Sequence, residues 1–144
     1  MHIRLILPCL LMLGALPAIA ADEAPACKRN FKQEGSFIAG RRFSTWDLVP
    51  VPPAMAYKRI YAEVVKSGLT VVSSDKEMGL ISIEQKNGGV TNTGAQVDLP
   101  WNVMIEASGK GSKVNVTKTT PGGYSTSQDF QITSMCAVID AARQ

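Results

Sequence analysis

The stretch "YKRIYAEVVKSGLTVVSSDKEMGLISIEQ", Tyr57–Gln85, decides the fold because its apolar period changes in the middle. Its first part places apolar side chains at positions i, i+3, i+4, i+7 and i+8, which is one face of an amphipathic helix. These side chains are Tyr57, Ile60, Tyr61, Val64 and Val65. The pattern predicts a helix over residues 54–67. Pro53 suits its first turn, and Gly68 suits the left-handed residue just beyond its end.

After Gly68 the period becomes two. Apolar and polar residues alternate in "LTVVSS" and again in "LISIEQ", which indicates two β-strands. The few residues between them, Asp75 to Gly79, predict the turn of a hairpin.

The flanking segments add further strands and a second helix. "FIAGRRFSTWDLV", residues 37–49, predicts a strand with a kink at Gly40, and a second hairpin is predicted from the alternation in residues 101–107 and 113–117. Between the hairpins, residues 86–96 are rich in Gly, Asn and Thr and predict a mobile loop. A last helix is predicted to begin at a capping box, Ser125 with Gln128.

The predicted order is therefore β-α-β-β-β-β-α. An antiparallel sheet of about five strands with both helices packed on one face buries every apolar stripe at once, as a two-layer domain requires. We therefore expect a helix-grip-like α+β fold.

The first twenty residues are typical of a secretory signal peptide. Arg4 precedes an apolar run that ends in Ala18-Ile19-Ala20, which predicts cleavage near Ala20/Ala21. We expect a polar leader over 21–35 and a single domain over 36–144. No later apolar run is long enough to cross a membrane, so a periplasmic or secreted bacterial protein with no stable membrane span is predicted.

Export also bears on the cysteines. Once the signal peptide is removed with Cys9, the mature chain retains Cys27 and Cys136. In an oxidising compartment the two predict a disulfide, which the chain-entropy model values at about 4 to 5 kcal/mol.

Composition argues against several classes of function. The net charge of +3 is small and scattered, whereas nucleic-acid-binding proteins carry a basic patch. The mature chain contains no histidine and its acids follow no ligand spacing, so we expect no metal and no cofactor. No pair of groups is marked for acid–base or nucleophilic catalysis, so the expected protein is not an enzyme.

The run from "MAYKRIYAEVVKSGLTVVSSDKEMGLISIE" through "WNVMIEASGKGSKVNVT" to "SMCAVIDAA" resembles small, uncharacterised bacterial envelope domains. The helix-grip C-terminal domains of BamC-like envelope proteins are a named example. The resemblance covers about residues 43–142 and implies a periplasmic binding or assembly role. It brings no catalytic residues with it.

The leading hypothesis is a non-enzymatic periplasmic protein that binds a protein or a cell-envelope component, through the open sheet face or the loop over residues 86–98. An inhibitor or immunity protein for a secreted cell-wall hydrolase is one specific version. The possible partner-binding residues are Asp75, Lys76, Glu77, Asn87 and Asn92.

Two further hypotheses differ in the site that they require. A small-molecule or lipid carrier needs a pocket lined by Trp101, Met104 or Tyr61. An enzyme needs a cleft that holds two carboxylates within hydrogen-bond reach of each other, drawn from Asp75, Glu77, Glu84, Asp98 and Glu106.

Overall fold

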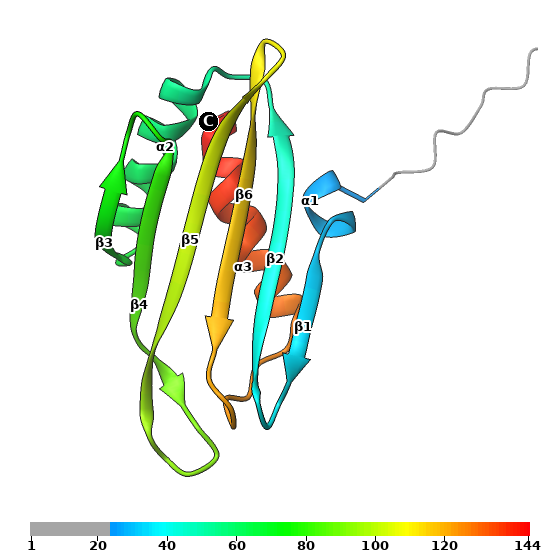
Figure 1. Cartoon of the computed structure of the whole chain (residues 1–144), viewed down its shortest axis with the longest axis vertical. Helices are drawn as coiled ribbons and strands as arrows, with labels where there is room; N and C mark the ends of the chain where they lie inside the picture. Colours follow the sequence, from blue (N-terminus) through cyan, green and yellow to red (C-terminus); the bar gives the residue numbers. More distant parts are fainter. Residues whose placement is uncertain (1–23) are drawn as a thin grey trace, which may run out of the picture.

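The computed structural model describes residues 24–144, which form an antiparallel six-stranded sheet with its main helices on one face (Figure 1). The strands are β1 (Lys32–Ser36), β2 (Gly40–Val49), β3 (Thr70–Asp75), β4 (Leu80–Val90), β5 (Gln96–Ser108) and β6 (Gly111–Thr120), and their order in the sheet is β1-β2-β6-β5-β4-β3. The helices are α1 (Ala26–Arg29), α2 (Pro53–Lys66), α3 (Gln128–Asp140) and a final 3-10 turn η1 (Ala141–Arg143). The predicted two-layer α+β class is confirmed, with six strands instead of about five.

The stretch Tyr57–Gln85 folds as its periods predict. Helix α2 begins at Pro53, and Gly68 follows its end with a φ of 79°. β3 and β4 then form the predicted hairpin, and Gly79 takes a φ of 68° at its turn. Because a Cβ on Gly79 would lie 2.2 Å from the carbonyl oxygen of Ile105, only glycine fits there.

The second hairpin, β5 with β6, is also confirmed, and it supplies the middle of the sheet. The inward-facing apolar side chains of the four central strands meet those of α2 and α3 in one core. Its largest fully buried members include Phe43, Ile60, Ile81, Ile83, Leu99, Met135 and Ile139.

The expected strand over residues 37–49 is wrong in its first three residues. Residues 37–39 are the turn of a hairpin whose first strand is β1, and β2 begins at Gly40, where φ is 95°. The polar leader expected over 21–35 accordingly contains α1 and β1. Every side chain of β1 is exposed, so this edge strand shows no apolar alternation.

The mobile loop expected over 86–96 is also wrong for most of its length. β4 continues to Val90 and β5 begins at Gln96, with a shift of register between Gln85 and Gly89. Asn87 lies in this bulge with a φ of 52°, and its backbone N–H donates to Asp98 Oδ1 at 2.8 Å. A bulge adds residues to one strand and interrupts alternation, which explains why the composition resembled that of a loop.

The N-cap of helix α3 lies two residues later than predicted. Ser127, not Ser125, is the N-cap, and its Oγ accepts a hydrogen bond of 3.2 Å from the backbone N–H of Phe130. The change moves Phe130 into the first turn of the helix.

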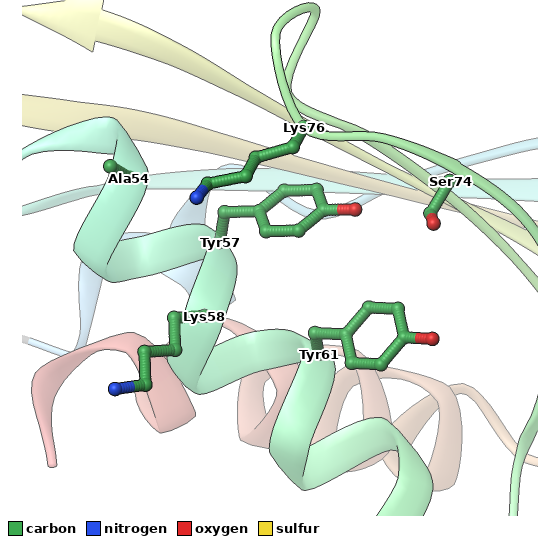
Figure 2. A pocket seen from close by; sticks show the side chains of 6 residues that line it. All are labelled: Ala54, Tyr57, Lys58, Tyr61, Ser74 and Lys76. Carbon is green, nitrogen blue, oxygen red and sulfur yellow. The ribbon is translucent and has the colours of Figure 1, made fainter.

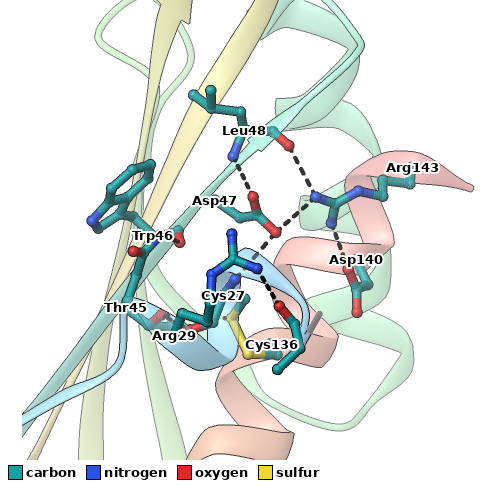
Figure 3. Close-up of polar contacts among 11 residues, drawn as sticks. Cys27, Arg29, Thr45, Trp46, Asp47, Leu48, Cys136, Asp140 and Arg143 are labelled. Atoms are coloured by element: carbon teal, nitrogen blue, oxygen red, sulfur yellow. Dashed lines mark hydrogen bonds and ion pairs between the residues drawn. A yellow bond between two sulfur atoms is a disulfide. The ribbon is translucent and has the colours of Figure 1, made fainter. Parts of the chain in front are cut away.

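The predicted disulfide between Cys27 and Cys136 is present and joins α1 to α3, with the two Cα atoms 5.8 Å apart (Figure 3). Asp47, on the inward face of β2, lies beside it. Asp47 Oδ2 accepts from the backbone N–H of Cys27 at 3.3 Å and from the Arg143 guanidinium at 2.9 Å. These contacts attach the first helix and the C-terminal turn to the same strand.

The predicted signal peptide, residues 1–20, and its cleavage site lie outside the described residues. Among the helices of residues 24–144, none is long and apolar enough to cross a membrane.

Candidate functional site

The five predicted partner-binding residues do not form one site. Asp75 ends β3, and Lys76 and Glu77 lie in the turn before β4, whereas Asn92 follows the other end of β4. Asn87 lies within the bulge of that strand and has the structural role given above. The sheet therefore separates the two groups by most of the length of β4.

The structure brings together two of the five candidate carboxylates, but on an exposed surface. Lys86 donates a 3.1 Å hydrogen bond to Asp98 and also pairs with Glu84. The hydrogen bond that Lys86 donates to Glu84, and then the one that it donates to Asp98, raise the pKa of the Lys86 amine above its ordinary value. The backbone N–H of Asn87 and then Lys86 hold the pKa of Asp98 below its ordinary value. These pKa shifts show that the paired charges stabilise the bulge of β4.

A different residue, Lys118, is the most unusual charged group of the described chain. It occupies an inward-facing position of β6, in line with the buried Val114 and Val116, and only 1% of its surface is exposed. Buried lysines normally have an acidic partner, because an unpaired buried charge is costly. Within residues 24–144, Lys118 forms no ion pair.

Two aromatic rings and one amide surround the Lys118 amine. Its Nζ lies 4.2 Å from the centroid of the Trp101 ring and 5.8 Å from that of Phe130, and it donates to Gln85 Oε1 at 3.1 Å. Trp101 is its direct neighbour across β5 and β6. Burial lowers the pKa of the Lys118 amine to about 8, so the group is still mainly a cation at neutral pH.

The hydrogen-bonding capacity around this lysine is incompletely used. An ammonium group has three N–H donors, and within residues 24–144 only the Gln85 oxygen accepts one from Lys118. The indole Nε1 of Trp101 is buried without a partner in the described structure. Buried donors are normally satisfied, so these unpaired donors next to a cation are groups that an added acceptor would satisfy.

An open cleft of about 260 Å³ adjoins Lys118 and is named here the Lys118 cleft. Three of its lining residues, Gln85, Trp101 and Phe130, are the residues that contact the lysine. The remaining lining residues come from α2, the connection between α2 and β3, and α3: Glu63, Ser67, Leu69, Ser134, Ala137 and Val138. Phe130 is 53% exposed, so its ring is the outer cover of the amine.

Sequence reasoning missed Lys118, although a signal for it was present. In "KVNVTKTT" the alternation that places Val114 and Val116 in the core also places Lys118 there. Gln85 follows Ile81 and Ile83 on β4 in the same way. Each of the two neighbouring hairpins thus has a polar residue at a predicted core position. These two residues could have indicated a site.

A second concavity lies between α2 and the edge strand β3, on the helix side of the sheet (Figure 2), and is named here the α2–β3 groove. It has a volume of about 410 Å³ and is lined by Ala54, Tyr57, Lys58, Tyr61, Ser74 and Lys76. The rings of Tyr57 and Tyr61 stack with centroids 6.1 Å apart and extend toward β3. It shares no lining residue with the Lys118 cleft.

The three residues named for a carrier pocket thus fall in three places. Trp101 lines the Lys118 cleft and Tyr61 lines the α2–β3 groove, whereas Met104 lies on the open face of the sheet, where it lines a depression of about 370 Å³ with Arg42 and Asn115.

Comparison with known proteins identifies a shared fold. No protein-family model matches the sequence, and no curated protein sequence matches it. The crystal structure of Ara h 8.0201 covers 72% of this chain and 95% of its own, with a TM-score of 0.51 and 17% sequence identity. The crystal structure of CalU16 from Micromonospora echinospora covers 76% of this chain and 98% of its own, with a TM-score of 0.46 and 8% identity. The likeness to Ara h 8.0201 shows the fold of the sheet and its helices.

Proposed function

We propose that this protein is a carrier of small organic anions, and that it binds their carboxylate beside Lys118 and their apolar part in the Lys118 cleft. The observation that carries the proposal is a buried lysine without an acidic partner at the edge of an open cleft. A bound carboxylate supplies the missing counter-charge and accepts hydrogen bonds from the unused donors of Lys118.

The lining of the cleft fits such a ligand. Trp101, Leu69 and Val138 offer apolar contact, and Ser67, Gln85 and Ser134 offer polar groups at its margin. Ligand sites commonly combine a mostly apolar wall with a few polar groups that fix orientation. The size of the cleft, about 260 Å³, limits the ligand to a small acid, such as a medium-chain aliphatic or a single-ring aromatic acid. In this proposal the Phe130 side chain moves to another rotamer, so that the carboxylate reaches the Lys118 amine.

Carriage accounts for the site better than catalysis does. The Lys118 nitrogen is enclosed by two rings and already donates to Gln85. This arrangement attracts an anion electrostatically, and although Glu63 also lines the cleft, no carboxylate of residues 24–144 forms a hydrogen bond or ion pair with the lysine. We further propose that the protein acts in the periplasm or outside the cell, as the Cys27–Cys136 disulfide and the predicted signal peptide support.

Binding of octanoate, with octanamide as its neutral analogue, tests the proposal. The chain contains two tryptophans, so Trp46→Phe leaves Trp101 as the single tryptophan reporter beside the cleft. In this background octanoate is expected to change the Trp101 fluorescence saturably, and octanamide to bind at least about tenfold more weakly, because a hydrogen bond to a charged group contributes about 1.5–3 kcal/mol.

The variant that isolates the lysine is Lys118→Met, and the chain offers a matched control. Lys113 lies on the same strand but on the opposite face, with its Nζ 4.5 Å from the Trp46 ring. Lys118→Met is expected to remove the preference for octanoate over octanamide, while Lys113→Met leaves it unchanged. Equal octanoate affinity with and without Lys118 would contradict the proposal.

A further inference from the structure

We propose that the α2–β3 groove is a second binding site, at which an extended peptide with an acidic side chain pairs with β3 as an added strand. The site is independent of the Lys118 cleft. It combines the free edge of β3 with an exposed line of apolar side chains and two lysines that have no partner among residues 24–144.

The first observation is the position of β3 at the edge of the sheet. Among residues 24–144, β3 pairs with β4 on one side and has no strand on the other. Its outer backbone N–H and C=O groups can therefore accept another strand. Peptides are commonly recognised in this way, with main-chain hydrogen bonds giving affinity and alternate side chains giving specificity.

The second observation is where alternate side chains of an added strand would go. Ser74 pairs with the buried Ile81, so its side chain lies on the helix side of the sheet. Small side chains on β3 leave the space into which Tyr57 and Tyr61 extend from α2 (Figure 2). Every second side chain of an added peptide would enter this space and pack on the two rings.

The third observation is charge. Lys58 and Lys76 both line the groove, no carboxylate lines it, and neither lysine has an ion pair or hydrogen-bond partner among residues 24–144. The neighbouring Asp75 carboxylate is used in the turn, where its Oδ1 accepts from the backbone N–H of Met78 at 2.9 Å. The groove therefore favours a peptide with an acidic side chain.

The apolar surface around the groove extends beyond it. Tyr61 and Val65 are four residues apart on α2 and therefore lie on one line of the helix surface, and they are 36% and 55% exposed. Val72 on β3 is 62% exposed. These side chains offer a short strand further apolar contact.

The shape of β3 favours a short peptide over a second copy of the chain. A bulge between Val71 and Ser73 breaks the regular edge. Bulges and lysines at edges hinder open-ended pairing between whole sheets. Two copies paired through β3 would also bring their unpartnered lysines to the same interface.

Fluorescence anisotropy with a labelled heptapeptide, TFTETVT, tests the proposal. Its Phe, Glu and Val share one face of a strand, and TFTQTVT is the neutral control. The native protein is expected to bind TFTETVT. In the double variant Lys58→Gln/Lys76→Gln the affinity for TFTETVT is expected to fall about fivefold or more, to the affinity for the neutral peptide. Lys66→Gln is the matched control, because Lys66 lies on α2 outside the groove. It is expected to have no effect.

Two N-methylated forms of the peptide test the strand pairing itself. One is methylated at its odd-numbered amides and the other at its even-numbered amides. Since a strand turns alternate N–H groups toward opposite edges, only one of the two is expected to lose binding. Equal binding of both forms, no binding of TFTETVT at millimolar concentration, or a β3-mediated dimer in light scattering that the peptide leaves intact would each overturn the proposal.

Discussion

Replacing Cys27 and Cys136 together by alanine is expected to lower the free energy of unfolding by about 2–5 kcal/mol. The two residues are 109 positions apart, so the disulfide closes nearly the whole described chain and strongly restricts its unfolded state. The bond also holds α1, which is only four residues long, against α3.

Urea unfolding followed by circular dichroism measures this effect. The native protein unfolded in the presence of dithiothreitol is the control, and its midpoint should approach that of the double variant. We expect the folded sheet to persist, because Asp47 still accepts a hydrogen bond from the Cys27 amide and still pairs with Arg143. A decrease of less than about 1 kcal/mol in the free energy of unfolding would show that the disulfide does not stabilise the chain in this way.

Lys118→Met is expected to stabilise the unliganded protein at pH 7 by about 1–3 kcal/mol, because it replaces an unpaired buried charge by an apolar side chain of similar length. The same substitution is expected to impair octanoate binding. A residue that costs stability and is needed for a ligand is typical of a functional site.

The pH dependence follows from the lowered pKa of Lys118. The amine titrates at about 8 in the folded protein, against 10.5 as its ordinary value. Between these two values the unfolded chain binds more protons than the folded one, so stability contributed by this group rises with pH. Lys118→Met should lack that rise from about pH 8 to 10, whereas Lys113→Met should keep it. A variant with the native pH profile, or one less stable at pH 7, would contradict the assigned environment of Lys118.

Much of the fold could be predicted because the period of the apolar residues and the glycines and prolines at the ends of the elements agreed over long segments. Helix α2 follows from its i, i+3, i+4 spacing, and both hairpins of β3 to β6 follow from alternation, with glycines at their ends. The edge strand β1 could not be predicted in this way, because all five of its residues are exposed and carry no apolar pattern. The bulge around Asn87 was missed for a related reason, since added residues interrupt the period of a strand.

The candidate sites were less accessible to sequence reasoning. Lys118 stands at an inward position that alternation alone identifies, but its lack of an acidic partner depends on which residues the three elements β4, β5 and α3 place around it. The α2–β3 groove depends on the space between a helix and an edge strand. Lys76 was predicted to contact a partner and lines that groove, whereas Lys58, which also lines it, was not among the predicted partner-binding residues.

The titration of Lys118 itself, by NMR of its side-chain ¹³Cε and with Lys118→Met to assign the resonance, tests whether a bound carboxylate lies beside this lysine. A pKa of about 8 is expected in the free protein. Saturating octanoate should raise it, because a bound anion favours the charged amine, and octanamide should not. A Lys118 pKa that octanoate leaves unchanged, while octanoate is bound, would contradict the placement of the carboxylate beside this lysine.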